Sequence, residues 1–277
     1  MKQVLFVAMM VLTLNSFSQK GSGKIILVKG QKFIVKDTIT QETDMGMGMS
    51  MKNNTTSKYK FAILDVNDKN YIATKTLTDL KMAMDMMGQQ VNYDSDKKED
   101  SASEIGKSIQ NLNLPDTFTL DKNTGAVTVN KKNIIDKKND SNPLENMFES
   151  MGSISESNSS DPFLIIPAGI KAGGSWVDSA SNADNKWMKK YTLTSIDKNL
   201  ATIKMEGNVQ SNVKTDMQGM QVSISISTKT TGEIIIDSKT SLVNRKNTIS
   251  DISGTLEMMG QSMPVTGKGT TTSVYEY

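Results

Sequence analysis

Hydrophobic and polar residues alternate along most of this chain of 277 residues, and clusters of Asn, Asp, Gly, Ser and Thr interrupt the alternation. A period of two is typical of β-strands with one face in a core and the other in water, and such polar clusters are typical of turns. Several alternating runs exceed the usual strand length of about five or six residues. The pattern therefore predicts a large, strongly curved antiparallel sheet.

Three long strands are predicted in the first third of the chain. The first runs from Lys32 to about Met51, the turn 52–56 follows, and the second strand is 58–66. On the first strand, one face holds Phe33, Val35, Ile39, Met45, Met47, Met49 and Met51. After the turn 67–70, one face of the third strand holds Ile72, Leu80, Met82, Met84 and Met86. These two faces are predicted to lie side by side in the sheet.

The region from about 94 to 161 is predicted to be a helical and flexible insert. After the charged loop 94–100, Ser101 and Glu104 have the spacing of a capping box, and apolar residues follow at helical intervals at 105, 109 and 112. Residues 116–130 predict a hairpin that turns at 122–125. A second short helix is predicted from its cap Asn142 to Gly152, and a flexible linker over 153–161.

The last hundred residues are predicted to form a meander of strands joined by short turns. The strands expected are 186–196, 200–210, 213–217, 221–237, 241–258 and 263–277. The sequences DMMGQQV, DMQGMQV and EMMGQSMPV share an acid, a Met and a Gly at equivalent positions. We interpret them as three hairpins that turn at Gly88, Gly219 and Gly260, and a duplicated sheet is the alternative explanation.

The first residues have the pattern of a secretory signal peptide. A positive start at Lys2 precedes an apolar run from Val4 to Leu14, and Ser16 and Ser18 are the small residues that export peptidases read. We therefore predict a signal peptide over 1–18 and a single exported β-rich domain over 19–277, in the periplasm or outside the cell. No Cys follows the run, so the protein is not expected to be a lipoprotein, and no later window predicts a transmembrane helix.

Composition excludes several kinds of chemistry. The chain has no Cys and no His, which removes thiol nucleophiles, zinc–thiolate sites and the commonest general base. The formal net charge is only +2, so no nucleic-acid partner is expected. No nucleophile-elbow or phosphate-loop motif is complete. We accordingly predict that the protein is not an enzyme, with no catalytic residues, no metal and no cofactor.

The alternating methionines are the candidate ligand-binding residues. They are Met45, Met47, Met49 and Met51 on the first strand and Met82, Met84 and Met86 on the third. Methionine is flexible and polarizable, which suits either an irregular core or an adaptable apolar pocket. A Cu(I) site is a further alternative, although successive methionines on one face stand about 6.8 Å apart along a strand.

The segment PAGIKAGGSW, from Pro167 to Trp176, contains a P-x-x-[VI]-K-x-G-x-x-W element. With Ile170, Lys171 and Gly173 in place, it resembles a family of uncharacterised exported bacterial β-rich proteins, a domain of unknown function. The family often has Asp after the Gly, where this chain has Gly174. The resemblance implies a fold and no activity, and from the sequence we expect Trp176 to have a structural role.

The predicted fold class is mainly β (α+β), a large curved antiparallel sheet or half-open barrel with one or two short helices. At the level of the fold it resembles half-barrel periplasmic carriers of lipids or lipoproteins. We expect a non-enzymatic envelope protein that binds an apolar small molecule or lipid on the methionine-rich concave face of the sheet. The alternatives are a structural or interaction protein without a small-molecule ligand, and an outer-membrane barrel, which the scarcity of aromatic residues disfavours.

Overall fold

The computed structural model describes residues 22–129 and 162–277, apart from 47, 87, 104, 105, 107, 108, 110, 111, 182–184, 218, 219 and 259. The predicted signal peptide, the predicted helix at 142–152 and the predicted linker at 153–161 lie outside the described residues, as do Glu104 and Ile105 of the predicted first helix. Within the described part, the one α-helix is α1, Lys98–Ser101.

The described residues form a 12-stranded antiparallel sheet that does not close on itself. The strands are β1 Lys32–Asp44, β2 Ser50–Val66, β3 Asn70–Met86, β4 Gln89–Asp94, β5 Pro115–Asp121, β6 Val127–Val129, β7 Ser175–Ser181, β8 Asn185–Asp197, β9 Leu200–Met217, β10 Met220–Asp237, β11 Val243–Met258 and β12 Gln261–Glu276. Their order is β6-β5-β3-β2-β1-β12-β11-β10-β9-β8-β7, and β4 also pairs with β3. The predicted fold class is confirmed.

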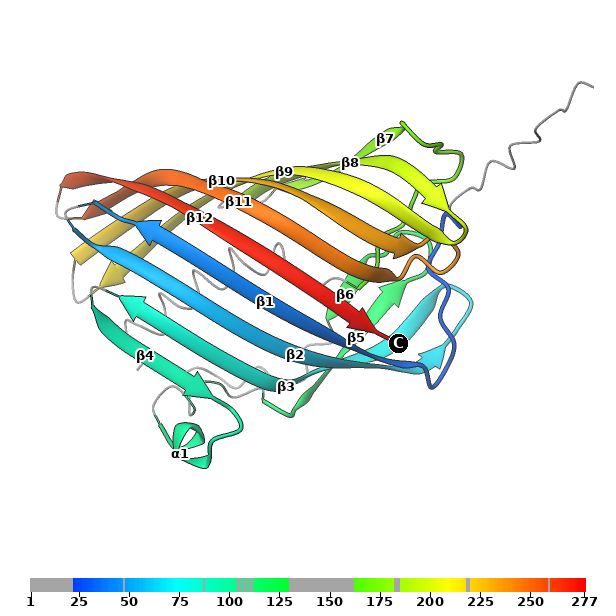
Figure 1. The fold of residues 1–277 in the computed structure, drawn as a ribbon, viewed down its shortest axis with the longest axis horizontal. Helices are drawn as coiled ribbons and strands as arrows, with labels where there is room; N and C mark the ends of the chain where they lie inside the picture. The colour runs from blue at the N-terminus through cyan, green and yellow to red at the C-terminus, as the bar shows by residue number, and fades with distance from the viewer. Residues whose placement is uncertain are drawn as a thin grey trace, which may run out of the picture.

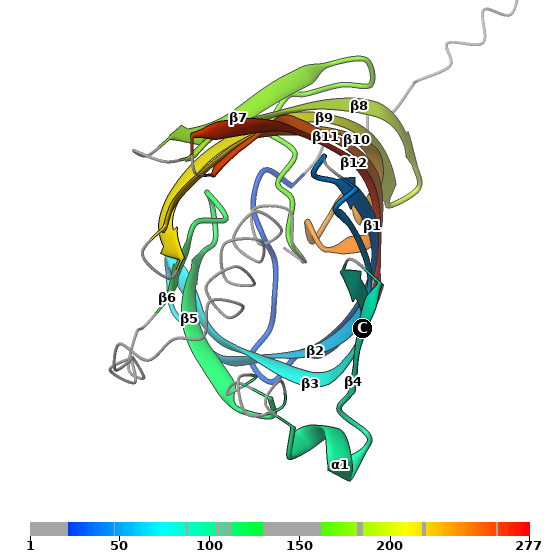
Figure 2. The same ribbon diagram turned by 90° about the vertical axis from the view of Figure 1, so that its left-hand side faces the viewer.

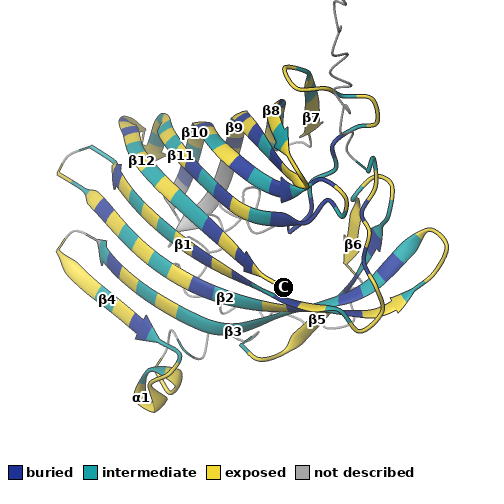
Figure 3. Cartoon of the chain, turned by 45° about the vertical axis from the view of Figure 1, so that its right-hand side comes forward, coloured by how far each residue is buried: buried dark blue, intermediate teal, exposed yellow. Residues whose placement is uncertain are grey.

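The sheet curls into a half-open barrel whose long strands run side by side (Figures 1 and 2). Pairing of the first strand β1 with the last strand β12 joins the N-terminal and C-terminal meanders into one continuous sheet. Buried and exposed residues alternate along β1, β2 and β12 (Figure 3). The period-two pattern of the sequence therefore separates a concave inner face from an outer face in water.

The first hairpin turns earlier than the sequence suggested. The first strand ends at Asp44 and the next begins at Ser50, and between them the Met45 N–H donates to the Met49 carbonyl over 2.9 Å. Gly46 and Gly48 adopt φ values of 77° and 78°, which favour glycine. The predicted turn at 52–56 is wrong, because these residues lie within β2. Two glycines with left-handed backbone therefore place the turn between β1 and β2 earlier in the chain than predicted.

A β-bulge in β3 changes which side chains share a face. Tyr59 pairs with Leu77 and Lys58 pairs with Asp79, so Thr78 is an extra residue between them. Because side chains alternate along a strand, one inserted residue exchanges the two faces. The prediction that Ile72 shares a face with Leu80 and the methionines is therefore wrong, and Tyr71 and Ala73 are the buried residues there.

Other sequence predictions are confirmed in full or in part. The hairpin at 116–130 is confirmed as β5 and β6, and the turns at Gly88 and Gly260 are confirmed with φ values of 80° and 76°. Gly219 lies outside the described residues. The strands predicted at 200–210 and 213–217 are one strand, β9. Phe163 pairs with Leu242 in one isolated antiparallel bridge.

The outer face of the sheet is mainly polar, although Val177, Met188, Ile249 and Val274 are exposed on it. On β9, for example, Lys204 and Glu206 face outward and form an ion pair of 2.8 Å, and Gln210 is exposed on the same face. Among the described residues, no helix has both the length and the apolar character needed to span a membrane.

Candidate ligand-binding face

The concave face is closed at one end by a tightly packed aromatic core. Phe33 stacks on Phe61 with ring centroids 4.9 Å apart, and the Phe163 ring meets Phe33 edge-on at 6.0 Å. Phe118 packs edge-on against Phe61 at 6.3 Å. We call this part of the concave face, together with the buried Tyr275, the aromatic end.

Two chain segments cross the aromatic end and fill it. The first is 22–31, in which the Ile25 N–H donates to the Lys122 carbonyl at 2.8 Å and the Ile26 N–H donates to the Thr240 carbonyl at 3.0 Å. Lys122 follows β5 and Thr240 precedes β11, so the segment links the two halves of the sheet across the concave side. The second is 162–170, which contributes Phe163 and Ile166 to the same core.

Burial raises the pKa of the Tyr277 hydroxyl at this end, with a smaller contribution from Asp237. The phenol therefore stays protonated, and it donates a hydrogen bond to the carbonyl of Val243. The end of β12 is thereby fixed to the start of β11.

The middle of the concave face is polar. Its buried polar residues lie on five adjacent strands, and we call them the polar band: Ser57, Asp37, Ser273, Lys246, Thr248, Thr228 and Thr230. Asp37, Ser273 and Lys246 stand in one row across β1, β12 and β11. The Thr230 and Ser250 hydroxyls lie 3.0 Å apart and share a hydrogen bond. Across these strands, the band separates two apolar regions of the concave face.

The second apolar region lies at the opposite end of the strands from the aromatic end. Met51, Met84, Val222, Met263 and Val265 are buried on the concave face there, and we call this region the methionine end. None of these five residues belongs to the cluster that forms the aromatic end.

The structure brings together only part of the predicted methionine site. Met51 and Met84 are buried and Met82 is half-buried, all on inward positions of β2 and β3. Met86 is opposite Met51 in the register of the same two strands. Met45 and Met49 are half-buried in the turn before β2 instead of on a strand, and Met47 lies outside the described residues.

Four residues near the predicted methionines were not predicted from the sequence: Tyr93, Val222, Met263 and Val265. Tyr93 is opposite Met82 in the register of β4 with β3, and it is only 2% exposed. Met263 and Val265 alternate with exposed Ser262 and Pro264, so the period-two pattern of β12 carries the signal that identifies them. Met263 and Val265 come near Met51 only because β12 pairs with β1, a strand distant in sequence.

Methionines gather at this end because four hairpins turn there. The turns that join β1 to β2, β3 to β4, β9 to β10 and β11 to β12 all lie at the same end of the sheet (Figure 1). The described methionines in these turns or within three residues of them are Met45, Met49, Met51, Met84, Met86, Met217, Met220, Met258 and Met263. Most of the methionines that the structure describes therefore lie at one end of the sheet.

Charges on the concave face are balanced among the described residues. Strand register places three cations and three anions there: Lys75, Lys189, Lys246, Asp37, Asp116 and Asp178. Lys75 is directly opposite Asp116, and Lys189 is directly opposite Asp178. The Lys75 ammonium also lies 4.3 Å from the centre of the Tyr59 ring. The described part of this face has no net formal charge.

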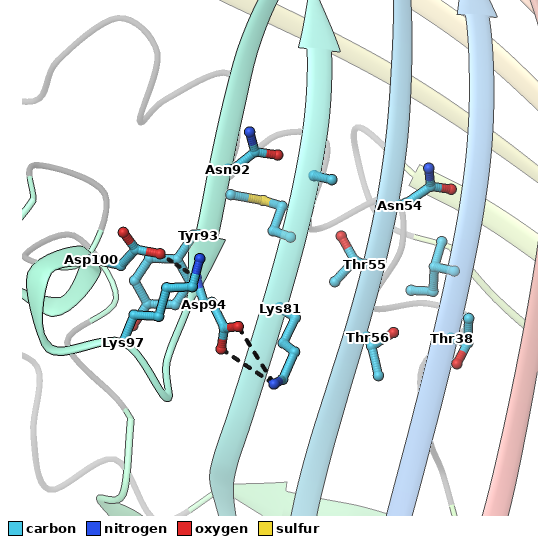
Figure 4. A pocket seen from close by; sticks show the side chains of 13 residues that line it. Thr38, Asn54, Thr55, Thr56, Lys81, Asn92, Tyr93, Asp94, Lys97 and Asp100 are labelled. Carbon is cyan, nitrogen blue, oxygen red and sulfur yellow. Dashed lines mark hydrogen bonds and ion pairs between the residues drawn. The ribbon is translucent and has the colours of Figure 1, made fainter.

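A shallow hollow of about 340 Å³ lies over β1 to β4 beside α1 (Figure 4). Lys81 there pairs with Asp96 at 2.7 Å and with Asp94 at 3.4 Å. Asp96, and then Asp94, raise the pKa of Lys81. The Asp96 backbone N–H and the Lys81 ammonium lower the pKa of Asp94. Because the lysine has two acidic partners, this hollow is satisfied within the protein and is a weaker candidate for a ligand.

The Pro167 to Trp176 element forms a turn that starts the edge of the sheet. The Gly173 N–H donates to the Leu193 carbonyl at 2.7 Å, and the Leu193 N–H donates to the Gly174 carbonyl at 3.0 Å. Trp176, the second residue of β7, stacks on Tyr191, with the ring centroids 5.4 Å apart. These contacts fit the structural role expected for Trp176, and they place Gly174 in a backbone contact.

The fold and this face define an open antiparallel β-sheet protein with a polar outer face and a concave face divided by a polar band. The chain belongs to the DUF6263 family, a family of unknown function whose model matches residues 68–243. The match includes the Pro167 to Trp176 element and confirms that the family is uncharacterised, whereas export remains a prediction. No curated protein matches the sequence.

Two solved structures are similar to this chain in parts of their folds. One is a structure of lipovitellin, described for its lipid–protein interactions, with a TM-score of 0.48, 8% sequence identity and 91% of this chain covered. The chain spans 26% of that lipovitellin chain. The other is an outer membrane channel from Pseudomonas putida F1, with a TM-score of 0.27, 7% identity, and coverage of 91% of this chain and 97% of that one.

Proposed function

We propose that this protein is a non-enzymatic, exported protein of the bacterial envelope that binds an apolar ligand at the methionine end of its concave face. The observation that carries the proposal is the division of that face. The aromatic end is filled by residues 22–31 and 162–170, whereas Met51, Met84, Val222, Met263 and Val265 form a separate apolar surface.

The side chains of the methionine end suit a ligand of variable shape. Methionine has three rotatable bonds and a polarizable thioether, so a surface rich in it adapts to different apolar partners. The polar outer face supports a protein that is surrounded by water. Export is supported by the signal-peptide pattern at 1–18, and N-terminal sequencing of the mature protein should begin at Gln19.

The binding proposal is tested with the full-length protein as it is purified from its host. Native mass spectrometry should detect a copurifying lipid or another apolar molecule, and delipidated protein should bind an environment-sensitive apolar dye. Met263→Asp should abolish dye binding because it places a carboxylate on the concave face. Ser262→Asp, at the adjacent exposed position of β12, should leave it unchanged.

Circular dichroism must show that both variants fold, and Val265→Asp with its control Thr266→Asp provides a second pair. Absence of any copurifying molecule together with absence of dye binding would overturn the proposal. That outcome would favour the alternative, a structural or interaction protein of the envelope with no small-molecule ligand.

A further inference from the structure

We propose that the polar band binds the head group of an amphiphilic ligand whose apolar chain extends toward the methionine end, and that this head group has no net charge. The inference rests on the proposed function and specifies the chemical class of its ligand. It depends on the buried hydroxyls of the band, on the apolar track that begins beside them and on the charge balance of the face.

Two hydroxyls of the polar band are left without a partner. In the part of the chain that the structure describes, Ser273 is 1% exposed and Thr228 is 4% exposed, and neither the Ser273 Oγ nor the Thr228 Oγ1 has a hydrogen-bond partner. A buried hydroxyl without a partner is costly, and most buried polar groups in proteins are hydrogen-bonded. Because both hydroxyls lie on the concave face, a polar group bound there would satisfy them.

An apolar track leads away from Thr228. The next inward residues of β10 toward the turn are Ile226, Ile224 and Val222, and β11 contributes Leu256 opposite Ile224. Thr228 and Val222 are six residues apart, which corresponds to about 20 Å along a strand. One leaflet of a bilayer contributes about 15 Å of hydrocarbon, so an acyl chain of ordinary length fits this track.

The opposite direction is closed to the chain of the ligand. Beyond Ser273 on β12 comes the buried Tyr275, which belongs to the aromatic core that the segments 22–31 and 162–170 fill. The geometry therefore orients the ligand, with its head at the polar band and its chain toward the four hairpin turns.

Charge balance selects the head group. Asp37 and Lys246 flank Ser273 in one row, and the six charged residues that the structure describes on the concave face sum to zero. Binding a head group with a net charge would cost free energy, because the charge would lose its water without meeting a matching net charge on the protein. A zwitterionic head, such as phosphocholine, matches both signs, and an uncharged glycerol head matches the hydroxyls.

The test compares amphiphiles that share one acyl chain. Delipidated full-length protein is titrated, below the critical micelle concentration, with lysophosphatidylcholine, monoacylglycerol, lysophosphatidylglycerol, the free fatty acid and the corresponding alkane, each displacing the apolar dye. The two net-neutral amphiphiles should bind at least about fivefold more tightly than the two anionic ones, a difference comparable to one net hydrogen bond.

Two variants test whether the Thr228 hydroxyl binds the head group. Thr228→Val keeps the shape of the side chain and removes the hydroxyl, so it should weaken lysophosphatidylcholine binding about fivefold and leave alkane binding unchanged. Thr231→Val, at an exposed position of the same strand, is the matched control and should change neither. Circular dichroism and a thermal melt establish that both variants fold.

The outcomes separate the two proposals. If the alkane and every amphiphile bind equally well, and Thr228→Val changes nothing, the head-group proposal is wrong while the apolar site stands. Preference for the anionic amphiphiles would also overturn it. If neither the alkane nor any amphiphile displaces the dye, the proposed function itself fails.

Discussion

The hydroxyl of Tyr71 donates a hydrogen bond to the carbonyl oxygen of Ile25 over 3.1 Å. The same hydroxyl accepts the Leu27 N–H at 3.0 Å, so one side chain of β3 holds two backbone groups of the crossing segment 22–31. Tyr71 is 3% exposed, and these bonds are therefore protected from water. They fix the segment that closes the aromatic end.

Replacing Tyr71 by Phe should lower the free energy of unfolding by about 1–3 kcal/mol. The substitution removes the hydroxyl and leaves the buried N–H of Leu27 and carbonyl of Ile25 without that partner, and an unsatisfied buried group costs about this much. Urea unfolding followed by circular dichroism measures the change. A Tyr71→Phe variant as stable as the parent protein would mean that water or a rearranged segment replaces the hydroxyl.

Truncating Ile25 to Ala should be more damaging than truncating its neighbour Ile26. Ile25 is 1% exposed within the aromatic core, whereas Ile26 is 42% exposed. Loss of a buried isoleucine side chain typically costs about 2–5 kcal/mol because it leaves a cavity, while exposed sites usually change stability by less than about 0.5 kcal/mol. Urea unfolding of the matched pair tests whether residues 22–31 are an integral part of the core, and equal effects would contradict that interpretation.

Gly254, on the concave face of β11, lies where the backbones of β10 and β11 approach closely. A Cβ there would stand 2.1 Å from the carbonyl oxygen of Ser225 on the neighbouring strand, so backbone would have to move. At Gly269 of β12, by contrast, the nearest atom to a Cβ is the Thr40 carbonyl oxygen at 3.5 Å, an ordinary contact. The two positions form a natural pair for testing how curvature is built.

Gly254→Ala should lower stability by about 1–3 kcal/mol, the usual range for forcing extra atoms into a packed site. Gly269→Ala should have an effect close to zero, since the added methyl group meets no overlap. Thermal melts of both variants provide the measurement. If Gly254→Ala were tolerated as well as Gly269→Ala, the close approach of β10 and β11 would not be needed for the curl.

Much of the sheet was predictable because its faces alternate cleanly. Long runs such as β10 and β12 carry buried and exposed residues at every second position, and local turns connect them, so short-range pattern was sufficient. The predicted assignment of residues to the two faces was wrong at two places, the turn at Gly46 and Gly48 and the bulge at Thr78, because backbone geometry there departs from a regular strand. Alternation does not show where a chain reverses or where one residue is inserted.

The methionine end was only partly predictable for a different reason. Met51 and Met84 were found from local spacing, but Val222 and Met263 join them through pairing between distant strands. The polar band likewise brings residues of β1 next to residues of β12, and these two strands are far apart in the sequence. The alternating pattern does not show which distant strands pair, because every strand has the same period of two.

Acid should destabilise the β5–β6 hairpin through Asp121. Its carboxylate accepts hydrogen bonds from the Thr124 N–H at 2.8 Å, the Asn123 N–H at 2.9 Å and the Thr124 hydroxyl at 2.9 Å, and these bonds lower the pKa of Asp121 below its ordinary value of 3.8. A carboxyl group with a lower pKa in the folded state contributes stability above its unfolded pKa. That contribution is lost as the pH falls through the folded pKa.

Asp121→Asn should therefore reduce the loss of stability between about pH 5 and pH 2, because the amide keeps an acceptor oxygen but does not titrate in that range. Asn123→Ala is the matched control, since it preserves the carboxylate and the backbone donors, and it should retain the steeper dependence of the parent protein. The measurement is the urea midpoint across a pH series. Parallel curves for the parent protein and Asp121→Asn would show that the turn carboxylate contributes nothing to acid sensitivity, and that other carboxylates with lowered pKa values, such as Glu206 beside Lys204, account for it.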